Sequence, residues 1–439
     1  MIETIPAKLI EKGMFVLELD RPWMGTPFLL QGFLVEDDEQ IADLHKYCQQ
    51  VTIDRSRSVG WHFRVPPVSK KNILPKLDAS SRDATVIVTR DDTPDYGSIF
   101  KNLRDTPQTR RRRKPPRRDE GRYSRLDEEL LFSTPIVDDV KQKLQNIQLA
   151  LQTSATCDLS EVVGLVGDMA EAVERNPDAM ILLARLRSTD EYSYDHAVDV
   201  SVHLMVLARF MGMPPSRIEM LGQIGLMQDI GKTKVPEGLL GKAEALTAKE
   251  RALVKSHVVS SIKILADQPG FSQEALAIVG SHHERFDGSG YPRRIKGERI
   301  SLYAELAGLV DTYCAMLRKR AYRDAISSQE ALESLNTVRD TQFRGPLVDQ
   351  LIQCIGIYPV GSLVELNSSE VAVVIEQNQV RRLQPRVMIV LAPDKSVEKR
   401  APTFDLMYSP SSPTGEPYRI VRSLPMNAYG VNAADYYLG

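Results

Sequence analysis

Five of the seven histidines in this 439-residue chain lie between residues 196 and 283, together with an aspartate that follows an apolar run. That aspartate, Asp229, comes after LGQIGLM and one glutamine, and a second one, Asp311, interrupts the apolar stretch LYAELAGLVDTYCAML. A carboxylate buried in such a setting is costly unless it is paired or binds a metal. Imidazole and carboxylate groups together suit iron, manganese or zinc, and several of them can hold two ions. The residue types therefore predict a metal centre. Its candidate histidines are His196, His203, His257, His282 and His283.

The stretch GLMQDIGKTKVPEG, residues 225–238, sharpens this prediction. Asp229 is followed at once by Ile-Gly-Lys, an arrangement suited to a metal and a phosphate. The residue before it is Gln228, where an imidazole would be the natural second ligand. An amide oxygen is a neutral and weaker donor for a divalent transition metal. An aspartate alone could equally be a helix cap or face solvent. The accompanying histidines make the metal interpretation the better one.

A second motif, SHHERFDGSGYP at residues 281–292, joins two adjacent histidines to a glycine-rich turn. Gly288 and Gly290 permit left-handed or tightly bent backbone, which lets polar groups of the turn approach a ligand closely. Paired histidines alone are weak evidence, whereas their combination with this turn is specific.

Composition narrows the class of protein. The chain is long enough for two or three domains, and its formal net charge of −2 gives no reason to expect nucleic acid as a partner. The N-terminal residues lack the build of a signal peptide, and no apolar run reaches transmembrane length. Four scattered cysteines are typical of reduced thiols. We expect a cytoplasmic protein without a transmembrane segment.

The front of the chain, residues 1–68, is predicted to be a small α+β module. GMFVLELDRPW, PFLLQGFLV and VTIDRS indicate strands, and EQIADLHKYC indicates a helix. Residues 69–125 form a basic, proline-containing linker with the run RRRRKPPRR at 110–118. This run is either a patch for nucleic acid or anionic lipid, or a solvated linker. The absence of interleaved aromatics favours the linker.

From residue 126 onward apolar residues recur at helical spacing. We expect a helical connector over 126–187 and a helical catalytic domain over 188–355, with a capping box from Thr247 to Glu250. The pattern then alternates, which predicts a β-rich extension over 356–439 with a hairpin in SLVELNSSEVAVVIEQN and a third strand in RVMIVLAP. The predicted fold is therefore multidomain: a mainly α-helical domain with a small β-rich tail, preceded by the α+β module. The helices of 126–155 offer a surface for a homodimer.

HHERFDGSGYP, the Asp-Ile-Gly-Lys of residues 229–232 and GLVDTYCAM resemble the HD-GYP family, a branch of the HD phosphohydrolases, over about residues 185–395. Residues 1–120, through GMFVLELDRPWMGTPFLLQGF, resemble the uncharacterised domain that precedes HD-GYP in many bacterial proteins. The resemblance implies a helical phosphodiesterase of bacterial signal transduction that hydrolyses cyclic di-GMP to pGpG or GMP. It also implies two or three bridged metal ions, commonly iron or manganese.

Matching the family pattern residue by residue gives a set of site residues. The first metal site would use His196, Gln228 in place of the family histidine, Asp229 and Asp311. The second would use Asp229 as a bridge, with His257, His282 and His283. Lys232 matches a lysine that contacts phosphate and, with Asp229, would serve catalysis, while Arg320 and Arg323 match basic residues near the guanine and phosphates. The loop that gives the family its name, where a partner protein could bind, is Asp287, Gly288, Ser289, Gly290, Tyr291 and Pro292.

Several positions depart from the family pattern. Tyr192 stands where some members have a glutamate that serves a third metal, so two metal sites are expected, the first of them weak. Cys314, Leu317 and Ala321 replace an aspartate, a threonine and a proline, and Lys242-Ala243-Glu244 replaces Lys-Pro-Gly. These changes weaken contacts to the substrate without removing ligands of the second site.

His203 does not fill the place of the missing ligand. It lies seven residues after His196, roughly 10 Å along a helix, whereas metal–nitrogen bonds are about 2 Å long. We expect a packed or supporting histidine.

Two functions remain. One is a cyclic di-GMP phosphodiesterase with reduced activity, favoured by six of the seven expected ligands. The other is an inactive receptor that keeps Lys232, Arg320 and Arg323, binds the nucleotide and signals through the front module or a partner. Gln228 favours the receptor. A purely structural domain with buried core histidines is disfavoured. The residues and the resemblance together favour the enzyme.

Overall fold

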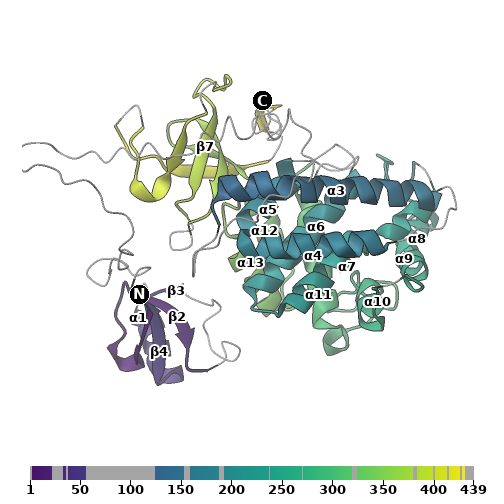
Figure 1. Cartoon of the computed structure of the whole chain (residues 1–439), viewed down its shortest axis with the longest axis horizontal. Coiled ribbons are helices and arrows are strands. Elements are labelled where there is room, and N and C mark those ends of the chain that lie inside the picture. The colour runs from purple at the N-terminus through teal and green to yellow at the C-terminus, as the bar shows by residue number, and fades with distance from the viewer. Residues whose placement is uncertain are drawn as a thin grey trace, which may run out of the picture. The chain divides into compact units, whose positions relative to one another are not determined.

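The computed structural model of the chain divides into two compact units, Met1–Asp95 and Tyr96–Gly439 (Figure 1). The structure describes residues 2–21, 33–35, 38–55, 124–152, 159–186, 192–236, 238–268, 270–318, 324–378, 383–398, 401–412, 415–425 and 428–430. Within these ranges, no helix combines the length and the apolar character that crossing a membrane requires.

The first unit contains an antiparallel sheet in the order β1-β4-β2-β3. Alternate residues of its strands pack on the helix α1, so that Val16, Leu44 and Ile53 are buried together. The predicted α+β character is confirmed, and β1 is an additional strand that the sequence pattern did not indicate. Of the predicted strand PFLLQGFLV, only residues 33–35 lie in the described part. The elements are β1 (Ile2–Pro6), η1 (Ala7–Leu9), β2 (Phe15–Leu19), β3 (Phe33–Leu34), α1 (Asp38–Tyr47) and β4 (Gln50–Asp54).

In the helical part of the second unit, α6 (Tyr192–Phe210) and α11 (Leu302–Met316) are the helices whose described residues are buried nearly all round. The predicted capping box from Thr247 to Glu250 begins α8, and a second box from Ser327 to Glu330 begins α12. The helices are α3 (Leu126–Gln152), α4 (Ser160–Arg175), α5 (Pro177–Leu186), α6 (Tyr192–Phe210), α7 (Pro215–Met227), η3 (Ile230–Lys234), α8 (Ala248–Lys255), α9 (His257–Leu265), α10 (Gln273–Val279), η4 (Gly297–Arg299), α11 (Leu302–Met316), α12 (Ser328–Thr337) and α13 (Gly345–Ile355).

The long helix α3 is attached to the centre of this bundle at two points. The Lys141 ammonium lies 2.6 Å from a carboxylate oxygen of Asp195 on α6, and both side chains are buried. Near the other end of α3, Lys234 donates a hydrogen bond of 2.6 Å to the backbone carbonyl of Leu151. A buried charge pair of this kind fixes position more than it stabilises the fold. The predicted connector is therefore packed against the helices that carry the candidate site.

The C-terminal part of the same unit is an antiparallel sheet in the order β8-β7-β6-β5-β9. The predicted hairpin is β5 (Leu363–Leu366) with β6 (Val371–Glu376), and the predicted third strand is β7 (Arg386–Leu391). Its buried strand residues belong to the same apolar core as the helices. The sheet is completed by β8 (Thr403–Asp405), η5 (Leu406–Tyr408), β9 (Ile420–Leu424) and η6 (Ala428–Gly430).

Candidate metal centre

Asp229 lies in the short turn between α7 and η3, and helix α9 holds that turn in place. Ser261 on α9 donates a hydrogen bond of 2.8 Å to the carbonyl of Gln228 and accepts one of 2.9 Å from the amide of Gly231. A Cβ at Gly231 would lie 2.1 Å from the carbonyl oxygen of His257. Only glycine therefore lets η3 approach α9 this closely, which brings Asp229 beside His257.

Three histidines surround Asp229, and we call Asp229, His257, His282 and His283 the three-histidine cluster. One nitrogen or oxygen of each lies within 4.8 Å of the others. His257 Nε2 is 3.1 Å and His282 Nε2 is 3.8 Å from Asp229 Oδ1. Their Nδ1 atoms lie 2.8 and 2.6 Å from the carbonyls of Val254 and Val279, to which only an N–H can donate. The Nε2 lone pairs therefore face the Asp229 carboxylate, as in a metal site whose ligands are held from behind.

The charge states fit such a site. Burial lowers the pKa of His282 to about 4, and it also lowers the pKa of His283 well below the usual value, with His282 adding to the effect. Burial raises the pKa of Asp229, but Lys232 and His257 together outweigh it and hold this pKa well below the ordinary range. At neutral pH two imidazoles are thus uncharged and the carboxylate is ionised, which is the protonation that metal binding requires.

A second group shares the same aspartate, and we call His196, Asp229 and Asp311 the one-histidine cluster. His196 Nε2 lies 2.8 Å from Asp311 Oδ1 and 3.9 Å from Asp229 Oδ2. Burial raises the pKa of Asp311, but the hydrogen bond from His196 and the charge on that ring outweigh this effect. The pKa of Asp311 is therefore below its usual value, and the carboxylate is ionised. His283 Nδ1 is 4.0 Å from Asp311 Oδ2, which connects the two clusters.

Gln228 stands next to this second cluster. The residue is 1% exposed, and neither the oxygen nor the nitrogen of its side-chain amide has a hydrogen-bond partner among the described residues. Leaving a buried amide without a partner costs about 1–3 kcal/mol per group. A cation or a polar ligand would relieve that cost. The amide thus remains a candidate donor, although a weaker one than an imidazole.

The predicted phosphate contacts have different outcomes. The Lys232 ammonium lies 2.5 Å from Asp229 Oδ2, so this lysine is at the cluster and is paired with its central carboxylate. Arg320 and Arg323 lie outside the residues that the structure describes. Their part in substrate binding remains a prediction.

The loop of residues 287–292 supports the three-histidine cluster from one side. Gly288 has the left-handed φ of +83° that was expected, and the amide of Ser289 donates to Asp287 Oδ1 at 2.8 Å. A Cβ at Gly290 would lie 2.4 Å from the carbonyl oxygen of His283. The ring of Tyr291, before a cis Pro292, stacks on His283 with centroids 4.6 Å apart.

The loop and α11 are also fixed to the two adjacent histidines. The buried Glu284 accepts hydrogen bonds from the amides of Arg293 and Ile295, at 2.7 and 2.9 Å. A Cβ at Gly308 would lie 2.1 Å from the carbonyl oxygen of His282, so α11 can approach only at a glycine. The roles of these supporting residues could not be predicted from the sequence, because they depend on distances between separate elements.

The other departures from the family pattern are buried or peripheral. Burial raises the pKa of the Cys314 thiol well above its usual value, and Leu317 packs in the core. Lys242 pairs with Glu250 at 2.7 Å, and Ala321 lies outside the described residues. His203 belongs to neither cluster, as expected: it is buried, and its Nδ1 donates to the carbonyl of Asp199 at 2.7 Å.

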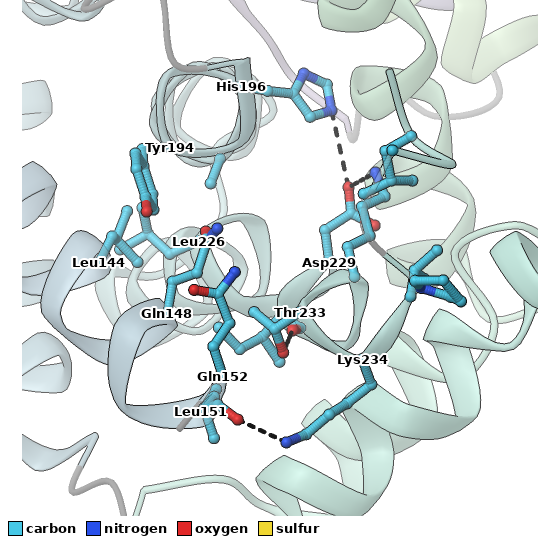
Figure 2. A pocket seen from close by; sticks show the side chains of 17 residues that line it. Leu144, Gln148, Leu151, Gln152, Tyr194, His196, Leu226, Asp229, Thr233 and Lys234 are labelled. Carbon is cyan, nitrogen blue, oxygen red and sulfur yellow. Dashed lines mark hydrogen bonds and ion pairs between the residues drawn. The ribbon is translucent and has the colours of Figure 1, made fainter. Parts of the chain in front are cut away.

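A cavity of about 560 Å³ opens beside the one-histidine cluster (Figure 2). Its volume falls in the range of small-ligand sites. His196, Asp229 and Lys232 line one side of it, and residues of α3 line another. The contribution of α3 to this cavity was not predicted from the sequence. The remaining lining residues are Leu144, Gln148, Leu151, Gln152, Tyr194, Ala197, Leu226, Ile230, Thr233, Lys234, Val235, Pro236, Gly238 and Leu240.

Comparison with known proteins places this site in a family. Residues 173–345 match the HD domain, and residues 2–156 match a domain of unknown function (DUF3391). The chain is 28% identical to the cyclic di-GMP phosphodiesterase PA4108 of Pseudomonas aeruginosa over 437 residues, which are 99% of this chain and 95% of that protein.

Two further relatives match only in part. The 3'3'-cGAMP-specific phosphodiesterase 2 of Vibrio cholerae is 30% identical over 43% of this chain and 34% of its own length. The cyclic di-GMP phosphodiesterase PdeB of Borreliella burgdorferi is 26% identical over 47% of this chain and 55% of its own. The chain thus spans between a third and slightly more than half of these two relatives. Its matched domains, its histidine clusters and its Gly-Tyr-Pro loop together show that it is an HD domain protein of the HD-GYP type, preceded by the DUF3391 domain.

Proposed function

We propose that this protein is a metal-dependent phosphodiesterase that hydrolyses cyclic di-GMP to pGpG or GMP in bacterial second-messenger signalling. The observation that carries the proposal is the convergence of four imidazoles and the ionised carboxylate of Asp311 around one residue, Asp229. Relatives named as cyclic dinucleotide phosphodiesterases support the substrate class, and PA4108 does so along nearly the whole chain.

The donor set suits two divalent ions, with iron or manganese preferred because the ligands are imidazoles and carboxylates. The second site would be held by the three-histidine cluster and the first by the one-histidine cluster together with Gln228. When bound, such ions supply positive charge for a phosphate and activate water as a nucleophile near neutral pH.

The chain's own residues would orient the reaction. His257 and His282 keep their lone pairs directed inward, because their Nδ1 protons are held by backbone carbonyls. Lys232 would exchange its contact with Asp229 for a phosphate oxygen and stabilise the charge that develops there. Arg320 and Arg323 would contact the guanine and phosphates, and the loop from Asp287 to Pro292 would hold His283 and offer a surface for a partner protein.

A second candidate function follows from Gln228. A buried amide in place of an imidazole would weaken the first site, so the protein could bind cyclic di-GMP without hydrolysing it and signal through its front module. We place either activity in the cytoplasm, in keeping with the reduced cysteines expected there. A homodimer through α3 remains a prediction.

The deciding experiment measures hydrolysis of cyclic di-GMP by anaerobically purified protein supplied with Fe²⁺ or Mn²⁺, beside the Gln228→His variant. We expect wild type to turn over, and the variant to bind a fuller complement of metal and to be about tenfold faster, since an imidazole is the stronger ligand. Metal content per chain is measured in parallel.

The receptor is favoured instead if wild type binds cyclic di-GMP without hydrolysing it while Gln228→His restores turnover. Silence of both proteins at full metal occupancy would contradict the phosphodiesterase proposal. The changes at Cys314 and Leu317 would then be the next positions to revert.

A further inference from the structure

The cavity beside the one-histidine cluster has one wall with no part in the proposed chemistry. That wall is α3, which contributes Leu144, Gln148, Leu151 and Gln152. Figure 2 shows the side chains of Gln148 and Gln152 on the side of Tyr194 and Thr233, across from His196 and Asp229. The helix belongs to the segment that matches DUF3391, residues 2–156, whereas the histidines lie in the HD domain match, 173–345.

Gln148 and Gln152 lie on a face of α3 whose other residues, Leu144 and Leu151, are apolar and buried. Leu144, Gln148 and Leu151 are spaced i, i+4 and i+7, so they share one face of the helix. Leu144 and Leu151 are buried, Gln148 is half-buried and Gln152 is exposed toward the cavity. Neither amide makes a hydrogen bond to another described residue. Each therefore keeps a donor and an acceptor for a ligand in the cavity.

Two contacts hold this wall in place. Lys141, one helical turn before Leu144, pairs with the buried Asp195 of α6 at 2.6 Å. Lys234 of η3 donates to the carbonyl of Leu151 at 2.6 Å, as the dashed line in Figure 2 marks. These contacts fix α3 to the same helix that carries His196 and to the segment that follows Asp229. A recognition site gains specificity when its donors are positioned before the ligand arrives.

Resting on the proposed function, we propose that Gln148 and Gln152 bind a purine base of the cyclic dinucleotide and so determine which dinucleotide is accepted. With a phosphate at Asp229 and Lys232, a nucleoside attached to it would extend into the cavity toward α3. Purine edges carry adjacent donors and acceptors, which a side-chain amide can match with two hydrogen bonds. A site built around such groups rejects a ligand that leaves them unpaired.

The test uses the full-length, Mn²⁺-loaded protein with Gln148→Leu and Gln152→Leu, and with Gln145→Leu as the matched control, since Gln145 is on the exposed side of the same helix. Two substrates are compared: cyclic di-GMP, and bis(p-nitrophenyl) phosphate, which has no base. KM and kcat are measured separately, and the dissociation constant for cyclic di-GMP is measured alongside.

We expect each cavity variant to raise KM and the dissociation constant for cyclic di-GMP about tenfold, the size of one lost hydrogen bond to a base. Hydrolysis of bis(p-nitrophenyl) phosphate should stay within about twofold of wild type, because metal and phosphate contacts are unchanged. Gln145→Leu should leave both substrates unaffected. The rate ratio of cyclic di-GMP to 3'3'-cGAMP should also shift, because the two differ only in one base.

Equal losses on both substrates would overturn base recognition and assign the glutamines a structural role. Wild-type values in both cavity variants would overturn it too. Failure of the proposed function looks different: if wild type binds cyclic di-GMP but does not hydrolyse it, the dissociation constants still test the inference. If wild type cleaves only the base-free substrate and does not bind cyclic di-GMP, both proposals fall.

Discussion

The two candidate metal clusters share Asp229, yet their histidines are held by different groups. In the three-histidine cluster, His257 and His282 are each held by a backbone carbonyl three residues earlier in the chain. In the one-histidine cluster, His196 is held by the side chain of Asp311, and the adjacent Gln228 has an amide without a partner among the described residues. A backbone support leaves the metal-binding nitrogen available, whereas a carboxylate support occupies it until a metal displaces the contact. The three-histidine cluster is therefore preorganised, whereas the one-histidine cluster is not.

The largest expected effect comes from removing the residue that both clusters share. Asp229→Asn removes the only carboxylate of the three-histidine cluster and one of the two carboxylates of the one-histidine cluster, where Asp311 remains. We expect bound metal to fall below one ion per chain and phosphodiesterase activity to drop by about 1000-fold or more. Metal analysis of the purified variant checks this. A variant that keeps both ions would show that Asp229 bridges neither cluster.

A smaller effect is expected from disturbing the support of the three-histidine cluster alone. Gly231→Ala places a methyl group 2.1 Å from the carbonyl oxygen of His257, so η3 must move away from α9. We expect the free energy of unfolding to fall by about 3 kcal/mol, together with weaker metal binding. Urea denaturation measures the first quantity.

Gly241→Ala is the matched control for this prediction. At Gly241 a methyl group would meet no atom within 4 Å, and the backbone there is not left-handed, so the substitution should change stability by less than about 1 kcal/mol. Equal stability of the two variants would mean that the turn at Asp229 tolerates a wider spacing from α9 than the structure indicates.

The smallest expected effect concerns an imidazole held by a carbonyl but placed outside both clusters. Burial lowers the pKa of His203 to about 4, whereas an exposed histidine in the unfolded chain titrates near 6.5. Between these values the unfolded chain binds the proton first, so stability is lost as the pH falls from about 6.5 toward 4.

Comparison with His203→Asn isolates this contribution. Between pH 7 and pH 5, with chelator present in both samples, wild type should lose roughly 1–2 kcal/mol more stability than the variant. Chemical denaturation at the two pH values provides the measurement. Parallel losses in the two proteins would assign the acid sensitivity to other groups.

The residues of the two clusters could be picked out from the sequence because they lie in short motifs whose side chains are typical metal ligands. Asp229, the adjacent His282 and His283, and Asp311 lie together in the two clusters, and their binding of metal stays a prediction. The helical and β-rich parts were also predicted from periodicity. The short strand β1 was not, because five residues ending in proline give too little alternation.

The supporting residues could not be predicted from their local sequence. Gly231 and Gly308 are needed because a second element passes within contact distance, which no local pattern states. Gln148 lies 81 positions before Asp229 in the sequence, and nothing in the helical pattern of α3 says which cavity its face will line. The local sequence offers one sign of these roles: Lys141 and Gln148 are polar residues on a helix face that is otherwise apolar.

The attachment of α3 has a consequence for how such proteins can be divided and recombined. A chain cut at the start of the HD domain match would lose the ammonium of Lys141 that faces the buried Asp195, and also one side of the cavity. Exchanging the segment that matches DUF3391 at its boundary, residue 156, would therefore replace one wall of the cavity as well. A hybrid protein that retains α3 with its HD domain keeps the cavity intact. When such domains are recombined, α3 should therefore accompany the HD domain and not the front module.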